Sequence, residues 1–253
     1  MKRKTNMATT IAVSGKGGSG KTTISAMIIR SLMKKPAKAI LAVDADPNSC
    51  LGLAMGVMPE STIAEIREQT RAKPAANEGL DKVRLVEYGI QQAVTEAKGF
   101  DLLTMGRPEG PSCYCAVNNL LRKFLDDLSS AYEFVVIDNE AGMEHLSRRT
   151  TNNVDLLLIV AEPGHVGKVT AKRIFELARK LPIEVRQIGI IWNRTELADS
   201  VEGVETFGCV PYDKAVLDAA MQGKTVLDLD MNTPVFAAVR NILESKIGKV
   251  NRK

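Results

Sequence analysis

The chain has 253 residues, with 34 Lys or Arg against 30 Asp or Glu, so its net charge is only +4 with the two histidines neutral. Hydrophobic residues make up 45% and charged residues 25%, which is typical of a globular domain and excludes disordered, collagen-like and coiled-coil chains. No apolar run reaches the roughly 20 residues that span a bilayer, and the basic start leads into polar residues, so we expect a cytoplasmic protein that binds no membrane. The small positive excess gives no reason to expect a nucleic-acid partner.

Short apolar runs alternate with longer amphipathic segments, which is typical of strands and helices around a mostly parallel sheet. We therefore expect one doubly wound α/β domain over 1–253, with an N-terminal extension at 1–8 and an irregular insertion at 61–112. The predicted strands are 9–14, 39–43, 101–105, 134–137, 155–161 and 186–192. The predicted helices are 21–33, 116–129, 166–180, 213–222 and 234–247.

Apolar residues recur at helical spacing near the C-terminus, which predicts a helix with one apolar face. They are Val235, Phe236, Val239, Ile242, Leu243, Ile247 and Val250. Such a face can pack against the sheet or bind a membrane. We favour packing, because the polar face carries Glu244 and few cations.

A glycine-rich segment between the first strand and the first helix fits the pattern GxxxxGK(S/T). It reads Gly15, Lys16, Gly17, Gly18, Ser19, Gly20, Lys21, Thr22 and Thr23. Glycines let successive N–H groups point at a phosphate, and the helix N-terminus adds the positive end of its dipole. We expect Lys21 to reach the β- and γ-phosphates and Thr22 to ligate Mg²⁺. The motif predicts a P-loop nucleoside triphosphatase.

Three aspartates lie where predicted strands end. Asp44 and Asp46 are two residues apart, so their side chains share one side of the chain. Asp138 ends the apolar strand that begins at Phe134, and an acid at this place would hold Mg²⁺ through water. The alternative for Asp44 and Asp46 is that they are acidic caps of a strand-to-loop turn.

A simple phosphate cradle does not need the second lysine of the loop, Lys16. With it, the segment resembles the deviant Walker A motif of the group of ATPases that contains MinD, ParA and the nitrogenase iron protein. This resemblance implies a homodimer in which Lys16 contacts the partner's nucleotide. It also implies that Asp46 positions the attacking water and that Asp44 supports the Mg²⁺ shell.

Two short segments are similar to the parts of these ATPases that hold the base. Asn193 and Arg194 follow the predicted strand 186–192, where the relatives usually read adenine with an asparagine. Pro211 and Tyr212 resemble the segment on the other side of the base. The implied nucleotides are ATP and ADP, although Asn193 and Arg194 can also be ordinary loop residues.

Cys113 and Cys115 are separated by one residue and can bind one soft metal ion, but they supply only two ligands. Zn²⁺ and Ni²⁺ generally take four, and a twofold dimer with this pair near its axis supplies the other two. The alternative is two apolar thiols in a loop. We expect Cys50 and Cys209 to lie in the core or behind the metal ligands. The two histidines are not spaced for a histidine metal site.

Segments 44–52, 113–115 and 140–148, together with the phosphate loop, resemble the CooC family of carbon monoxide dehydrogenase maturation ATPases along nearly the whole chain. The resemblance implies a dimeric ATPase that inserts nickel into the active-site cluster of carbon monoxide dehydrogenase or acetyl-CoA synthase, with Ni²⁺ or Zn²⁺ on the cysteine pair at the dimer interface. Two alternatives remain open. One is a MinD- or ParA-like positioning ATPase that binds membrane or DNA, and the other is an ATP-dependent iron–sulfur reductase.

Overall fold

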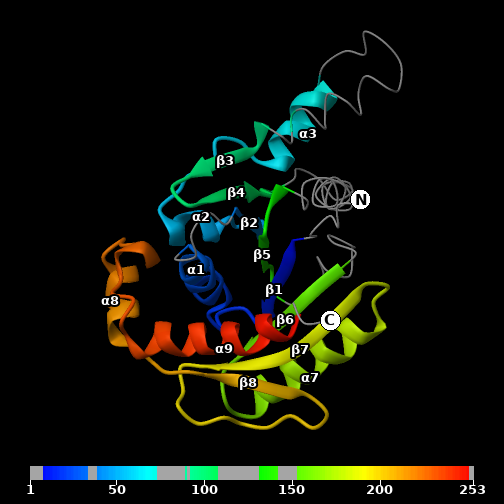
Figure 1. Ribbon diagram of the computed structural model, residues 1–253. Coiled ribbons are helices and arrows are strands. Elements are labelled where there is room, and N and C mark those ends of the chain that lie inside the picture. Colours follow the sequence, from blue (N-terminus) through cyan, green and yellow to red (C-terminus); the bar gives the residue numbers. More distant parts are fainter. Residues whose placement is uncertain are drawn as a thin grey trace, which may run out of the picture.

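A central sheet of eight strands, in the order β3-β4-β2-β5-β1-β6-β7-β8, organises the described part of the chain and carries helices on both faces (Figure 1). The computed structural model describes residues 8–33, 39–72, 89, 92–107, 131–141 and 153–250. The strands are β1 (Thr9–Gly15), β2 (Ile40–Ala45), β3 (Val94–Ala97), β4 (Phe100–Thr104), β5 (Phe134–Asn139), β6 (Asn153–Ala161), β7 (Glu184–Asn193) and β8 (Glu205–Val210). The α-helices are α1 (Lys21–Leu32), α2 (Cys50–Met55), α3 (Ile63–Ala72), α7 (His165–Lys180), α8 (Lys214–Met221) and α9 (Pro234–Val250). The doubly wound α/β fold that the alternating pattern predicts is confirmed.

The register of the strands brings the phosphate loop and two aspartates to one edge of the sheet. Every neighbouring pair of these strands is parallel except β3 and β4. Asp138 of β5 lies beside Val13 of β1 and beside Asp44 of β2, and Asp44 in turn pairs with Thr104 of β4. Because parallel strands end at the same edge, the loop that follows β1 meets both carboxyl groups there.

Two apolar cores lie on the two faces of the sheet. Helices α1, α2 and α9 cover one core, and α3 and α7 cover the other. Neighbouring residues of the central strands are therefore buried on opposite faces, as Ile11 and Ala12 of β1 are. This double burial explains why the central strands are nearly continuous apolar runs in the sequence.

Helix α9 packs against the sheet, as its apolar spacing predicts. The six apolar residues predicted to face inward and described here are buried, namely Val235, Phe236, Val239, Ile242, Leu243 and Ile247. Lys246 of this helix is also buried, with its Nζ 2.5 Å from Oε1 of Glu205 and 4.0 Å from the ring centroid of Phe207. The apolar face of α9, which a membrane-binding helix would expose to lipid, is thus buried in the core of this protein.

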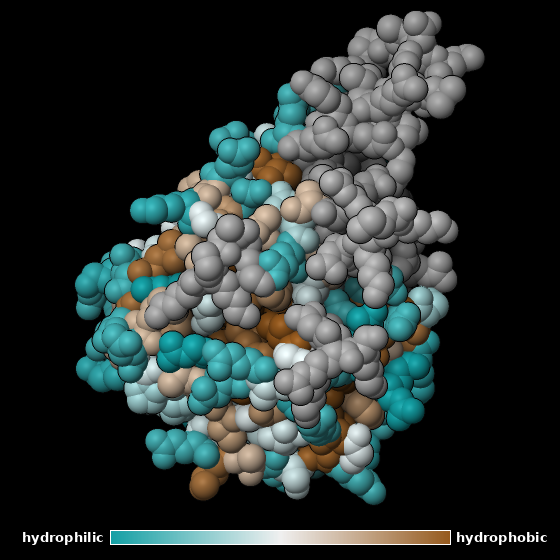
Figure 2. Space-filling model, in the orientation of Figure 1, coloured by the Kyte–Doolittle hydropathy of each residue, from teal (hydrophilic) through white to brown (hydrophobic). Residues whose placement is uncertain are grey.

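Polar residues cover much of the face that Figure 2 shows, with apolar residues in separate small areas between them. Among the described helices, none is both long enough and apolar enough to cross a bilayer.

Five elements of the described residues have no counterpart in the predicted strands and helices: α2, α3, β3, β8 and the short 3₁₀-helix η2 (Val226–Asp228). Two of them, α3 and β3, lie in the segment 61–112 that we expected to be irregular. Their apolar patterns are short, because α3 buries only Ile63, Ala64 and Ile66 among its described side chains and β3 is a four-residue strand at the sheet edge. The predicted helix 116–129 lies outside the described residues.

Candidate functional site

The loop between β1 and α1 has the geometry of a phosphate cradle. Gly18 and Gly20 have φ angles of 81° and 93°, which favour glycine because they are left-handed. The N–H of Ser19 donates to the carbonyl of Lys16 over 3.2 Å and closes the turn. The Nζ of the buried Lys21 donates to the same carbonyl over 3.3 Å, which holds this ammonium group against the loop.

Asp138 stands behind the loop and is almost completely buried. Its Oδ1 accepts a hydrogen bond from the hydroxyl of Ser25 over 3.0 Å, and the hydroxyl of Thr22 also donates to this carboxylate. Burial raises the pKa of Asp138 to about 6, against the opposing effect of these hydrogen bonds and of the charge of Lys21.

The donor set around Asp138 fits Mg²⁺. The Oδ2 atom of Asp138 is buried and has no hydrogen-bond partner among the described residues. Mg²⁺ prefers hard oxygen ligands. The unpaired carboxylate oxygen and the hydroxyl of Thr22 beside it are two such ligands. The sequence-predicted pair Thr22 and Asp138 is thus brought together.

Asp44 is fully buried, and its carboxylate accepts hydrogen bonds from the turn after β2 and from the start of α2, as expected of an acidic cap at a strand-to-loop turn. Its Oδ2 accepts from the N–H of Leu51 over 2.7 Å, and its Oδ1 accepts from the N–H of Asp46 over 3.2 Å. Burial raises the pKa of Asp44 to about 7, and the nearby charge of Asp138 adds to this effect. Asp46 is half-buried, and its Oδ1 accepts from the N–H and the side-chain amide of Asn48, both over 2.9 Å.

Asn193 joins the end of β7 to the phosphate loop. Its buried Nδ2 donates to the carbonyl of Ser19 over 2.8 Å, and its Oδ1 accepts from the N–H of Arg194 over 3.0 Å. Arg194 has a φ of 59°, and its Nη1 donates to Oε1 of Glu162 over 2.6 Å and to the carbonyl of Gly18 over 3.3 Å.

A cavity of about 430 Å³ lies beside these residues. Its lining includes all the residues predicted to hold the base, namely Asn193, Arg194, Pro211 and Tyr212, together with Gly20 and Thr23 of the loop segment. Apolar side chains of α1 and α8, such as Ile24 and Leu217, complete the lining. A flat, mostly apolar ring with a polar edge suits such a cavity.

The cysteines divide into two groups. Cys113 and Cys115 lie outside the described residues. Cys50 is exposed at the start of α2, so the prediction that it lies in the core is wrong, while Cys209 is half-buried and packs against the core. Among the described residues, no group of three or more His, Cys, Asp or Glu side chains could hold a metal ion.

Exchanging Gly20 for alanine is expected to weaken nucleotide binding at least about tenfold more than the same exchange at Gly18. Both glycines have left-handed φ angles, so both variants carry similar backbone strain. Only at Gly20 would the added Cβ lie 2.3 Å from Nδ2 of Asn193, whereas at Gly18 it meets nothing within 4 Å. Titration with a fluorescent ATP analogue measures the difference, and equal affinities would contradict the role given to the contact between Asn193 and the loop.

The strand, glycine loop, helix and buried acid together define a nucleotide-binding protein of the P-loop class. Residues 10–226 match the family described as "CbiA: CobQ/CobB/MinD/ParA nucleotide binding domain". The chain therefore belongs to this family.

Two relatives and one solved structure are similar to this chain along most of its length. An uncharacterized ATP-binding protein of Methanocaldococcus jannaschii is 42% identical over 250 residues, which cover 94% of this chain and 98% of the relative. The carbon monoxide dehydrogenase accessory protein CooC of Rhodospirillum rubrum is 35% identical over 238 residues, covering 87% and 89%. The cell division protein MinD of Aquifex aeolicus superposes with a TM-score of 0.69 at 22% identity, covering 95% and 97%, which shows a shared fold.

Proposed function

We propose that this protein is an ATP-hydrolysing metallochaperone that helps to insert nickel into the active-site cluster of carbon monoxide dehydrogenase or acetyl-CoA synthase. The observation that carries the proposal is the 35% identity with the CooC accessory protein over most of both chains. The pair Cys113 and Cys115 supports it, since two thiolates are suitable ligands for a soft cargo ion.

In this proposal ATP lies along the carboxyl edge of the sheet. Its base enters the cavity beside Asn193, and its phosphates lie in the loop, where the backbone N–H groups and Lys21 bind them. Thr22 and Asp138 would hold Mg²⁺, which would neutralise charge on the phosphates. Asp46 orients the attacking water, and the buried Asp44 fixes the backbone of the Asp46 segment through its hydrogen bond to the N–H of Asp46.

ATP binding joins two copies in a homodimer, because Lys16 of each copy completes the site of the other. The Cys113 and Cys115 pairs of the two copies then hold one Ni²⁺ or Zn²⁺ as cargo at the interface. Hydrolysis removes the contact that Lys16 makes with the terminal phosphate, so the dimer and its metal site loosen. A ligand shifts such an equilibrium only through its different affinity for the two states, which here is the affinity of ATP against that of ADP.

Metal analysis of protein purified without oxygen tests this function. We expect one nickel or zinc ion per two chains with a non-hydrolysable ATP analogue, and at least about tenfold weaker metal binding in Cys113→Ala or Cys115→Ala. Cys50→Ala is the matched control, since it removes an exposed thiol outside the pair. Unchanged stoichiometry in both pair variants would exclude the metallochaperone, and iron with sulfide in the sample would favour the reductase.

A further inference from the structure

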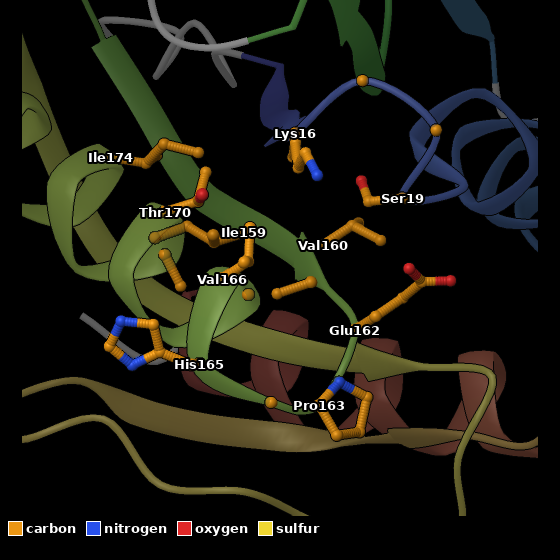
Figure 3. A pocket seen from close by; sticks show the side chains of 16 residues that line it. Lys16, Ser19, Ile159, Val160, Glu162, Pro163, His165, Val166, Thr170 and Ile174 are labelled. Atoms are coloured by element: carbon orange, nitrogen blue, oxygen red, sulfur yellow. The ribbon is translucent and has the colours of Figure 1, made fainter.

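A second cavity, of about 310 Å³, lies on the α7 side of the phosphate loop (Figure 3). One wall is the loop itself, from Lys16 to Ser19, and the other is the end of β6 with the first three turns of α7. The base cavity, in contrast, is lined by the first two turns of α1, by α8 and by the segments at the ends of β7 and β8. The nucleotide that we propose for the base cavity and the loop leaves this second cavity without an assigned ligand.

The chain enters α7 much as it enters α1, through a glycine turn that follows a parallel strand. Gly164 has a φ of 105° and no side chain that could cap the helix. A Cβ at Gly167 would lie 1.9 Å from the carbonyl oxygen of Glu162, so only glycine allows this close turn. Lys168 follows Gly167 directly, as Lys21 follows Gly20 in the phosphate loop.

The start of α7 offers backbone donors to the cavity. The N–H of Gly164 donates to Asp199 over 3.3 Å, and the N–H of Lys168 donates to the carbonyl of Gly164 over 3.0 Å. Those of His165, Val166 and Gly167 have no partner in the part of the chain that the structure describes. Unpaired N–H groups at the positive end of a 16-residue helix attract an anion.

A separate observation on the opposite wall points to a ligand. Ser19 is 4% exposed, and its Oγ has no hydrogen-bond partner among the described residues. In Figure 3 the side chains of Ser19 and Lys16 extend from the loop toward the cavity. A buried hydroxyl without a partner costs free energy unless a ligand supplies the hydrogen bond.

The charges around the cavity favour an anion. The carboxylate of Glu162 also lines it, but this group is paired with Arg194 at 2.6 Å. Lys16 is exposed and brings a positive charge to the cavity wall. Val160, Val166 and Ile174 supply apolar lining, so the cavity accepts a small organic group beside the anion.

We propose that this cavity binds a phosphate group, either as inorganic phosphate or as the head of a phosphomonoester. The N–H groups of the first turn of α7 receive the phosphate oxygens, and Lys16 and Ser19 bind from the loop. We expect this site to be filled together with Mg·ADP in the nucleotide site, because in the proposed function Lys16 contacts the partner's nucleotide only through the terminal phosphate of ATP.

Calorimetric titration of protein saturated with Mg·ADP tests the proposal, using inorganic phosphate and glycerol phosphate at constant ionic strength set with chloride. Val166 is 57% exposed in the first turn of α7, so Val166→Asp puts a carboxylate at the same helix end without disturbing the core. We expect both anions or one of them to bind the wild type, and Val166→Asp to weaken that binding at least about tenfold through charge repulsion. Val166→Asn, of the same size but uncharged, should bind within about threefold of the wild type, which is under 1 kcal/mol.

The two anions distinguish the source of the phosphate, since tighter binding of glycerol phosphate indicates an ester and equal or tighter binding of inorganic phosphate indicates the free ion. A folded Val166→Asp variant that binds both anions as the wild type does would overturn the proposal. So would loss of all anion binding when Mg·ADP is added, because the anion would then have occupied the nucleotide site.

Discussion

Replacing Lys16 by alanine is expected to lower the rate of ATP hydrolysis by about 10³-fold, as removal of a cation supplied by a partner chain does in related phosphoryl transfers. ATP affinity should change little. The loop uses the backbone carbonyl of Lys16, which accepts from Ser19 and Lys21, and alanine keeps this carbonyl. Steady-state phosphate release and nucleotide titration measure the two effects.

A mixing experiment separates a role in the partner's site from a role in the same chain. Lys21→Ala has a damaged site of its own but still offers Lys16, while Lys16→Ala has an intact cradle. We expect each variant alone to be nearly inactive and the mixture to recover up to about a quarter of wild-type activity, from the mixed dimers that hold one complete site. A mixture as inactive as its components would contradict contact across the dimer.

Replacing Asp138 by asparagine is expected to stabilise the protein without nucleotide and Mg²⁺ at pH 8, but not at pH 4. The pKa of Asp138 is raised from 3.8 to about 6 in the folded protein, so the folded state binds its proton more tightly than the unfolded chain does. Proton binding to Asp138 therefore stabilises the folded state, fully below pH 4, and this stabilisation is lost as the pH rises through 6. Asparagine keeps an acceptor for Ser25 and never ionises. The free energy of unfolding should therefore exceed that of the wild type by roughly 3 kcal/mol at pH 8.

Thermal unfolding in the presence of a chelator measures this difference, which corresponds to a rise in Tm of roughly 6–12 °C for a chain of this size. Asp46→Asn is the matched control, since it removes the same charge from a half-buried position. We expect only a small change of the pH profile in this control, because the charge of Asp46 is the weakest of the causes that raise the pKa of Asp138 and of Asp44. A slope that remains in Asp138→Asn is expected from Asp44, because burial still raises the pKa of Asp44 when the charge of Asp138 is absent. If Tm changed with pH in parallel for Asp138→Asn and the wild type from pH 4 to 8, burial of this carboxylate would not contribute to the pH dependence of stability.

The amino-acid sequence by itself determined the phosphate cradle and its acid. The residues Gly15–Thr22 form a continuous segment whose spacing reflects one local geometry, a strand turning into a helix around a phosphate. Asp138 was recognisable because it ends an apolar strand. The central strands were predictable since burial on both faces makes them continuous apolar runs.

Only the tertiary structure decided which distant residues complete these local units. Asn193 reaches the carbonyl of Ser19 across 174 positions of the sequence, and no pattern near either residue indicates this hydrogen bond. The edge strand β3 and the helix α3 bury too little apolar surface to leave a clear pattern, so they form through contacts with the rest of the sheet. The second cavity likewise exists only because β6 lies beside β1, which places the start of α7 against the phosphate loop. Such contacts depend on strand order, and strand order is a property of the folded chain as a whole.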